Sequence, residues 1–519
     1  MHGGFRVSKS SIAKRLRRRK ERMRRRLDKD HFPKQDGPVL DASNIQYELA
    51  DRTLATNYGG IGLVHSLVRD LGLAEEIDNR VHVLKLHLPY HESDHVLNLA
   101  YNILCDGQRL EDIEGRRQDE AYLNALDAER IPDPTTAGDF CRRFDEKDRK
   151  DLQEAIDAAR QKVWALQSAE FFQTATIDVD GTMVGTDGEC KEGMSLSYNG
   201  IWGYHPLVVT LANSGEVLRL ANRPGNRPSY EDAAKYLDEV IALCDRAGFA
   251  KIVLRGDTDF TQTTHLDRWD DLGNVQFVFG MDVTADRHID ADVLPKTAWK
   301  TLQRPPRYEV RTKRRGQRVR VKQQVVDANG YKDIRLVLEE VAEMEYRPVA
   351  CKRAYRLVIL RKWLQVRDRD QLEFFPDYRY FFYLTNDRKS SVEEIVFAAN
   401  DRCQQENVLA QLHALRALHA PVDNLQSNWA YMLMASLAWN LKAWLALTLP
   451  CDGRWREKHT EEKDRVLRME FRTFVNAFVR IPCQIVKTGR KIVYRLLAWN
   501  SWQPVFFRMA SHFQQRLQC

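Results

Sequence analysis

Five short apolar runs between residues 173 and 280 constrain the fold of this chain more than any other feature of its sequence. The runs are bounded by turn residues, which is typical of strands. Asn213-Ser214-Gly215 separates the second run from the third and predicts a hairpin turn. We expect strands at Ala175–Val179, Tyr204–Ala212, Val217–Ala221, Lys251–Leu254 and Val275–Phe279, with helices at Tyr230–Ala247 and Thr263–Leu272.

Three strands in hairpin order, followed by helix–strand–helix–strand, is the order of a ribonuclease-H-like fold. Other mixed α/β folds share this order, so it narrows the fold without settling it. We therefore predict an α/β protein with a ribonuclease-H-like catalytic core. Residues 285–376 interrupt the order with charged, alternating strands, which we interpret as a β-rich insertion. Residues 45–165 carry helix-period apolar runs and predict an N-terminal helical domain.

The remaining elements follow from the same patterns of apolar residues and breaks. In the insertion we expect strands at Tyr308–Thr312, Gln317–Val325, Ile334–Val341 and Tyr355–Val366. Outside it we expect helices at Ile61–Leu71, Val96–Leu104, Ala137–Phe144 and Ser391–Leu418, a strand at Tyr378–Leu384, and a hairpin of Cys483–Lys487 with Lys491–Leu496.

Positive charge is concentrated at the N-terminus. Residues 1–30 contain thirteen Lys or Arg and three Asp or Glu, whereas the whole chain has a net charge of only +7. Such a run repels itself, so we expect a disordered tail that a polyanion would neutralise. The nucleic-acid-contacting residues that we predict are Lys14, Arg15, Arg17, Arg18, Arg19 and Lys20. A solvated tail without a partner is the alternative.

The cysteines and the apolar stretches indicate a cellular compartment. The nine cysteines form no CxxC pair, which is the usage of a reducing cytosol. No apolar segment follows the N-terminal charges, so no secretory signal is expected. The most apolar stretch, Trp429–Leu449, contains Asn440 and Lys442 and is interpreted as a buried core helix rather than a membrane span. We expect a cytoplasmic, nucleoid-associated protein.

Three acidic residues stand where they could share a site. Asp180 and Asp257 each end a predicted strand beside a glycine, and Glu406 lies on the helix after the last strand. Arg402 precedes Glu406 by one helical turn and could hold a phosphate. Hard oxygen ligands suit Mg²⁺ or Mn²⁺, and two such ions could cleave a phosphodiester. Any one of these acids alone could equally be an ordinary surface residue.

The sequence resembles the bacterial insertion-sequence DDE transposases, in the branch with a β-rich insertion inside the catalytic domain. The matching stretches are TIDVDGT (176–182), IVLRGDTDF (252–260), YFFYLTN (380–386) and NDRCQQEN (400–407). The resemblance implies that Asp180, Asp257 and Glu406 are catalytic and bind two ions, with Asp180 bridging both. It also implies cutting at terminal inverted repeats and joining of the 3′-OH ends to target DNA, usually by a homodimer.

This sequence departs from the signature of that branch at two positions. The signature is Tyr, two residues, Arg, three residues, Glu, six residues, Lys. Arg402 and Glu406 match it, but Ala399 stands at the Tyr position and His413 at the Lys position. The departures weaken any inference about transposon-end contacts by those two side chains and leave the acidic triad intact.

The metal ligand in the first block has two candidates. Asp178 and Asp180 are two residues apart, so they point to the same face of a strand. We favour Asp180, because the family's Asp is followed by a small residue and Thr, and keep Asp178 as the alternative metal ligand. By the same reasoning Asp257 is preferred to Asp259.

These interpretations divide the chain into six parts. They are a basic disordered tail and linker (1–40), a helical DNA-binding domain (41–170), the first part of the core (171–284), the β-rich insertion (285–376), the second part of the core with the Glu-bearing helix (377–425), and a C-terminal helical and hairpin region (426–519).

Two other functions compete with this interpretation. A catalytically silent DNA-binding relative would keep the basic residues and carry a vestigial triad. His91-Glu92-Ser93-Asp94-His95 also fits the HExxH signature of zinc proteases. Pro89 precedes it and Ser93-Asp94 is a natural helix N-cap, so we expect a helix entry with exposed histidines.

Two further features are left open. The loop from Arg223 to Pro228 either faces DNA near the active site or is a plain turn. Trp202 and Tyr204 are expected to be core aromatics rather than surfaces for base stacking.

Overall fold

The computed structural model describes residues 9–28, 45, 47, 53–87, 89–304, 333–367, 377–488, 491–497 and 499–516. Its centre is a nine-stranded mixed sheet in the order β10-β11-β12-β13-β9-β8-β2-β6-β7. The strands are β2 (Ala175–Gly181), β6 (Leu207–Leu211), β7 (Glu216–Ala221), β8 (Ile252–Gly256), β9 (Val275–Met281), β10 (Lys300–Thr301), β11 (Asp333–Tyr346), β12 (Tyr355–Arg367) and β13 (Asp377–Thr385).

The half of the sheet from β9 to β7 confirms the expected order of elements. β2, β6 and β7 are antiparallel neighbours, and β8 and β9 run parallel to β2. The crossovers are α9 (Ala233–Ala247) and α10 (Thr263–Asp271). α9 ends at Gly248, whose φ of 90° is a left-handed conformation that glycine adopts without strain. The parallel pairing places the carboxyl ends of β2 and β8 at the same edge.

The second expected strand, Tyr204–Ala212, is divided between two sheets. Trp202–Tyr204 forms β5, the middle strand of a small sheet with β3 (Val184–Gly185) and β4 (Ser195–Leu196), whereas β6 belongs to the large sheet. Pro206 lies between β5 and β6. Since proline has no N–H to donate to a ladder, it separates the two strands.

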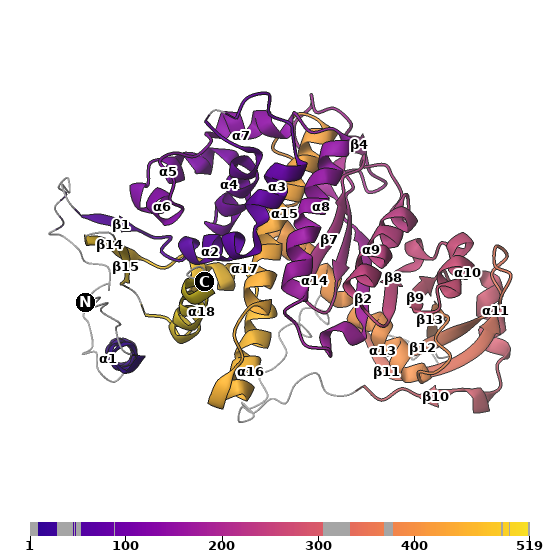
Figure 1. The fold of residues 1–519 in the computed structure, drawn as a ribbon. Coiled ribbons are helices and arrows are strands. Elements are labelled where there is room, and N and C mark those ends of the chain that lie inside the picture. The colour runs from indigo at the N-terminus through magenta and orange to yellow at the C-terminus, as the bar shows by residue number, and fades with distance from the viewer. Residues whose placement is uncertain are drawn as a thin grey trace.

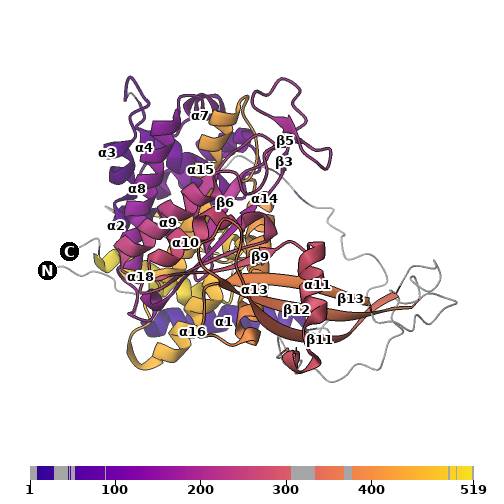
Figure 2. The same ribbon diagram turned by 90° about the vertical axis from the view of Figure 1, so that its right-hand side faces the viewer.

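The strand-rich segment after residue 284 extends the large sheet. β11 and β12 form a long antiparallel hairpin, β12 pairs with β13, and β13 pairs with β9. Figure 2 shows these long strands continuing away from the core. Residues 285–293 form a helix, α11 (Ala285–Val293), at a position where no element was expected. The strands expected at Tyr308–Thr312 and Gln317–Val325 lie outside the described residues.

The helix expected at Ser391–Leu418 is two helices, α13 (Val392–Asp401) and α14 (Cys403–Ala414). The side chain of Asn400 donates to the carbonyl of Val396 at 2.6 Å and so competes with the backbone ladder near the break. Arg402 stands at the junction, as the residue that ends one helix and begins the next.

The N-terminal helices pack around one long helix, α15 (Leu425–Leu447). They are α2 (Ile61–Leu71), α3 (Leu73–Arg80), α4 (Glu92–Leu104), α5 (Ile113–Arg117), α6 (Glu120–Ala125), α7 (Pro134–Cys141) and α8 (Glu146–Trp164). Figure 1 shows α15 (orange) running among these helices (purple), and it contacts α4, α8 and strand β7. α15 is the expected buried helix, and its Lys442 donates to the carbonyl of Leu467 at 3.0 Å.

A buried charge network joins the helices to the sheet. Glu216 on β7 accepts from Arg160 at 3.2 Å, from the indole N–H of Trp164 at 3.0 Å and from that of Trp444 at 2.7 Å. These three donors come from α8 and α15. Buried apolar residues of the N-terminal helices, the sheet and α15 also form one continuous cluster. The helical region and the sheet therefore share a core.

The two ends of the chain meet. Lys9–Leu27, part of the expected disordered tail, forms helix α1, and Arg19 donates to the carbonyl of Leu496 at 2.6 Å. The C-terminal elements are α16 (Arg456–Leu467), α17 (Phe471–Phe474), β14 (Cys483–Thr488), β15 (Lys491–Leu496) and α18 (Gln503–Arg516), and β1 (Leu54–Thr56) pairs with β14. The hairpin of β14 and β15 confirms the expected one. In the described parts of the chain, we find no helix with the length and hydropathy that crossing a bilayer requires.

Candidate active site

Asp178 is buried in an ion pair on the sheet. It lies opposite Arg255 in the pairing of β2 with β8 and is 1% exposed. Arg255 donates to both of its carboxylate oxygens, at 2.6 and 2.8 Å, and to the carbonyl of Ala398 at 2.8 Å. The charge of this buried carboxylate is thus compensated by a guanidinium within the protein. The pair also ties β2 and β8 to α13.

Asp180 and Asp257 lie on either side of one guanidinium. Arg402 Nη1 is 3.0 Å from Asp180 Oδ2, and Arg402 Nη2 is 3.8 Å from Asp257 Oδ2. The remaining oxygen of each Asp accepts a backbone N–H, from Gly181 at 2.8 Å and from Asp259 at 3.1 Å respectively. The structure therefore brings two of the three predicted acids together at the carboxyl ends of β2 and β8.

The two carboxylates are short of positive charge. Burial raises the pKa of Asp180 to about 6, and Asp257 contributes to the rise, while Arg402 opposes it. Burial also raises the pKa of Asp257, and Arg402 again opposes the rise. One guanidinium thus partly compensates two carboxylates. Oxygen donors with a deficit of nearby positive charge fit a divalent cation such as Mg²⁺ or Mn²⁺.

Glu406 does not share the Arg402 contact of the two Asp residues. It lies in the first turn of α14, is exposed, and has no ion-pair partner among the described residues. Its neighbour Gln405 is buried and anchors the helix to β6 through Thr210 and through the carbonyl of Val208 at 3.2 Å. In the part of the chain that the structure describes, the acidic triad does not form a group of ligand atoms within 4.8 Å of one another.

Comparison with known proteins decides the family. The chain matches the family described as transposase DDE domain group 1 over residues 38–518. The chain belongs to this DDE transposase family. DDE transposases generally use divalent metal ions, which agrees with the oxygen donors of Asp180 and Asp257. The match covers the helical region, the sheet and the C-terminal elements together.

More distant comparisons add little to the family assignment. No curated protein matches the chain. A solved structure described as a piggyBac transposase synaptic complex with hairpin DNA aligns with 10% identity, covering 90% of this chain and 85% of that chain, at a TM-score of 0.35. A TM-score this low does not establish a shared fold.

Two residues near Asp180 and Asp257 were not assigned a role from the sequence. Arg255 is one of them, and its signal was a charged residue inside an apolar strand. His413 is the other. Its Nε2 lies 2.9 Å from the hydroxyl of Thr182, two residues after Asp180, and burial lowers its pKa. His413 therefore places its ring against the loop that follows β2.

The loop after β7 is held in place by its own arginine. Arg223 is 6% exposed and donates to the carbonyls of His205, Ser229 and Glu231, at 3.0, 3.0 and 2.7 Å. Its positive charge is therefore engaged by backbone carbonyls inside the protein. Arg227 in the same loop is exposed and pairs with Glu231 at 3.2 Å. Of the two arginines, Arg227 is the one that remains open to an outside partner.

The structure corrects the prediction for Trp202. This residue is 54% exposed, whereas Tyr204 is fully buried and donates to the carbonyl of Glu192 at 2.9 Å. Trp202 and Tyr204 are two positions apart in β5. In a flat strand their side chains would therefore share one face. Gly203 between them has a φ of 157°, and the small sheet buries only its Tyr204 end.

The HExxH stretch does not form the histidine pair of a zinc protease. α4 begins at Glu92, with His91 at its N-cap, and the N–H of His91 donates to Asp94 at 2.8 Å. His95 is 3% exposed and stacks on Phe140 with ring centroids 4.3 Å apart. The expectation of an exposed histidine is confirmed for His91 and wrong for His95, and the predicted N-cap at Ser93-Asp94 is wrong by two residues.

The predicted DNA-contacting residues lie on α1. Five of them are exposed, and Arg19 is half-buried because it contacts the C-terminal hairpin; the five are Lys14, Arg15, Arg17, Arg18 and Lys20. They therefore form a basic helical surface rather than a disordered run.

Proposed function

We propose that this chain is a metal-dependent DNA transposase that cuts at terminal inverted repeats and joins the freed 3′-OH ends to target DNA. The observation that carries the proposal is the pair of Asp180 and Asp257, which face one guanidinium at the ends of adjacent parallel strands. This arrangement fits the family, in which acidic residues on separate elements bind divalent ions. A ribonuclease-H-like core remains our prediction for the half-sheet from β9 to β7.

In this proposal Asp180, Asp257 and Glu406 hold two Mg²⁺ or Mn²⁺ ions. Bound there, the ions would activate the attacking hydroxyl and stabilise the leaving oxygen in phosphodiester cleavage. Glu406 approaches the two Asp residues when the site is assembled, and Gln405 keeps the start of α14 close to β6 in the meantime. Asp178 takes no part in metal binding, because Arg255 occupies both of its oxygens.

Arg402 has a double role in this proposal. Without metal it compensates the charge of the two Asp residues, at 3.0 Å from Asp180. Once cations supply that charge, its planar fork is released to bind a DNA phosphate. Transposon-end DNA and target DNA are the proposed partners, and α1 supplies further phosphate contacts through its exposed Lys and Arg residues. We infer a homodimer, as is usual for the resembling transposases.

Cleavage of the element's own ends tests the proposal. Inverted repeats are sought in the DNA on both sides of the gene and made as labelled duplexes, which are incubated with the full chain and Mg²⁺ or Mn²⁺. Asp180→Asn, Asp257→Asn and Glu406→Gln should each lower cleavage and strand transfer by at least about 10³-fold, since each removes a ligand. Asp259→Asn is the matched control, because Asp259 is exposed beside Asp257. Full activity of the Asp257 variant contradicts the proposal.

The exposed position of Glu406 also leaves room for the second candidate, a catalytically silent DNA-binding relative. Such a protein would bind the terminal repeats without cleaving them. Calorimetry separates the two functions: the transposase binds Mn²⁺ and loses that binding in Asp180→Asn. A relative without catalysis binds DNA equally well with and without Mn²⁺.

A further inference from the structure

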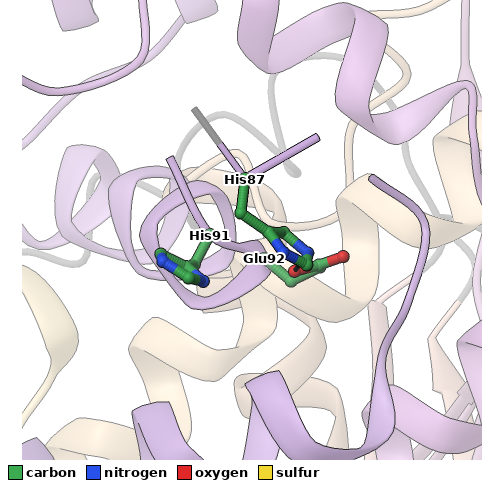
Figure 3. A group of neighbouring side chains, drawn as sticks. All are labelled: His87, His91 and Glu92. Atoms are coloured by element: carbon green, nitrogen blue, oxygen red, sulfur yellow. Dashed lines mark ion pairs between the residues drawn. The ribbon is translucent and has the colours of Figure 1, made fainter. Parts of the chain in front are cut away.

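A second group of metal-ligating side chains lies far from the DDE residues in sequence. His87 is in the segment between α3 and α4, His91 is the N-cap of α4, and Glu92 is its first residue. One ligand atom from each of them lies within 4.8 Å of the other two. Among the described residues no other such group of His, Cys, Asp and Glu is present. Figure 3 shows the Glu92 carboxylate beside the His87 ring.

The carboxylate of this group is buried and oriented. Glu92 is 1% exposed, and one of its oxygens accepts the backbone N–H of Leu84 at 3.1 Å. Its other oxygen lies 3.2 Å from His87 Nε2. Groups that ligate a metal are commonly fixed by hydrogen bonds of this kind from a second layer of residues. Glu92 therefore has one oxygen held in place and one directed at the histidines.

The two imidazoles are exposed and close together. The rings of His87 and His91 are stacked, with centroids 5.0 Å apart and an interplanar angle of 12°. Neither ring is enclosed by the protein, so each can turn about its own side-chain bonds.

We propose that His87, His91 and Glu92 bind one zinc ion. A ligand set of two imidazole nitrogens and one carboxylate oxygen binds zinc in preference to Mg²⁺ or Ca²⁺. Tetrahedral zinc with bonds of roughly 2.0–2.2 Å requires the ligand atoms to close up and the stacked rings to open. The fourth position faces solvent and takes a water molecule. His95 is excluded from this site, because it is stacked on Phe140 in the core.

The bound ion would fasten the segment before α4 to the first turn of that helix. The backbone N–H of Leu84 already reaches Glu92 across this segment, and the ion adds His87 to the same anchor. α4 packs against α15 in the shared core. Zinc at this site is therefore expected to act on the stability of the helical region, independently of the acidic residues at β2 and β8.

Zinc titration of the full chain tests this inference. The protein is stripped with a chelator, dialysed, and titrated with ZnCl₂ by calorimetry and with CoCl₂ by absorption spectroscopy. We expect one high-affinity equivalent with the visible absorption of tetrahedral cobalt. His87→Ala and His91→Ala should each weaken it by at least about 10-fold, because each removes a direct ligand. Zinc should also raise the melting temperature of the parent and of neither variant.

His82→Ala is the matched control, since His82 is an exposed histidine of the same segment. It should keep the zinc equivalent and the rise in melting temperature. His87 lies in an exposed loop, so His87→Ala tests the site even if His91→Ala disturbs the start of α4. Equal zinc binding by the parent and His87→Ala, or loss of the equivalent in His82→Ala, would overturn the assignment.

Discussion

Arg255 donates to both carboxylate oxygens of Asp178, at 2.6 and 2.8 Å, across the parallel strands β2 and β8. This contact distinguishes Asp178 from Asp180, which the sequence places on the same face of one strand. Asp178 links β2 to β8 inside the sheet. Asp180 instead faces Arg402 and Asp257 at the carboxyl ends of these strands. The two residues should therefore differ in what their replacement damages.

Asp178→Ala should destabilise the protein by about 3–5 kcal/mol, because it leaves the buried guanidinium of Arg255 without its partner. Chemical denaturation measures this loss. Asp178→Leu combined with Arg255→Leu should recover a large part of it, since no unpaired charge remains. Asp180→Asn should change stability by less than about 1 kcal/mol and instead abolish Mn²⁺ binding. A metal-binding defect without a stability defect in Asp178→Ala would reverse the assignment of these two residues.

Arg402→Ala should separate metal binding from DNA binding. Arg402 contacts Asp180 and Asp257 in the absence of metal, so its removal should strengthen Mn²⁺ binding by about 10-fold, as expected for loss of a partly buried competing charge. Binding of terminal-repeat DNA in the presence of Mn²⁺ should weaken, because a phosphate contact is lost. Calorimetry and fluorescence anisotropy measure the two effects. Arg379→Ala, an exposed arginine on β13, should change neither.

Glu216→Ala should destabilise the helical region and the sheet together. Arg160, Trp164 and Trp444 all donate to this carboxylate, and Arg160 and Trp444 are fully buried. The loss is expected to be about 3–5 kcal/mol, with a single lowered transition in calorimetry. Glu231→Ala removes a surface partner of Arg227 and should cost less than about 1 kcal/mol. Two separate transitions in the Glu216 variant would show that the parts unfold independently.

Acid should destabilise the protein through His419. Burial, together with the nearby charges of Arg416, Lys191 and Arg109, lowers the pKa of His419 to about 4. The unfolded chain binds a proton at this residue near pH 6.5, so stability is complete above that pH and falls as the pH drops towards 4. The contribution is about 2 kcal/mol after allowance for partial exposure. Unfolding measured between pH 4 and 7 should depend less on pH in His419→Leu than in the parent or in His82→Leu.

The strands and helices that the sequence predicts well are those with local signals. β8 and β9 are mostly apolar runs, and α9 ends at a glycine that takes the left-handed conformation. The acidic residues at the ends of β2 and β8 could be predicted together because parallel strands deliver their carboxyl ends to one edge. The family match over residues 38–518 confirms the DDE transposase assignment, while the roles of the three acids stay predictions.

Features that depend on long-range pairing could not be predicted from the sequence. The ion pair between Asp178 and Arg255 depends on the register of β2 against β8, and no local sequence pattern determines that register. The break at Arg402 lies beside Asn400, whose side chain bonds to a carbonyl of its own helix, and the sequence pattern alone did not show this contact. The union of β12 and β13 with β9 is another long-range pairing, so residues 285–376 could not be assigned to the large sheet from their composition.

The pairing of β12 with β13, and of β13 with β9, limits which segments of such a chain can be deleted. β13 is hydrogen-bonded to β12 on one side and to β9 on the other. A deletion of β11 and β12 would turn β13 into an open edge, with unpaired N–H and C=O groups beside the buried aromatic rings of Tyr380 and Phe382. Such an edge is prone to aggregation. Excision of this hairpin alone is therefore disfavoured, because the shortened sheet would need another way to protect its new edge.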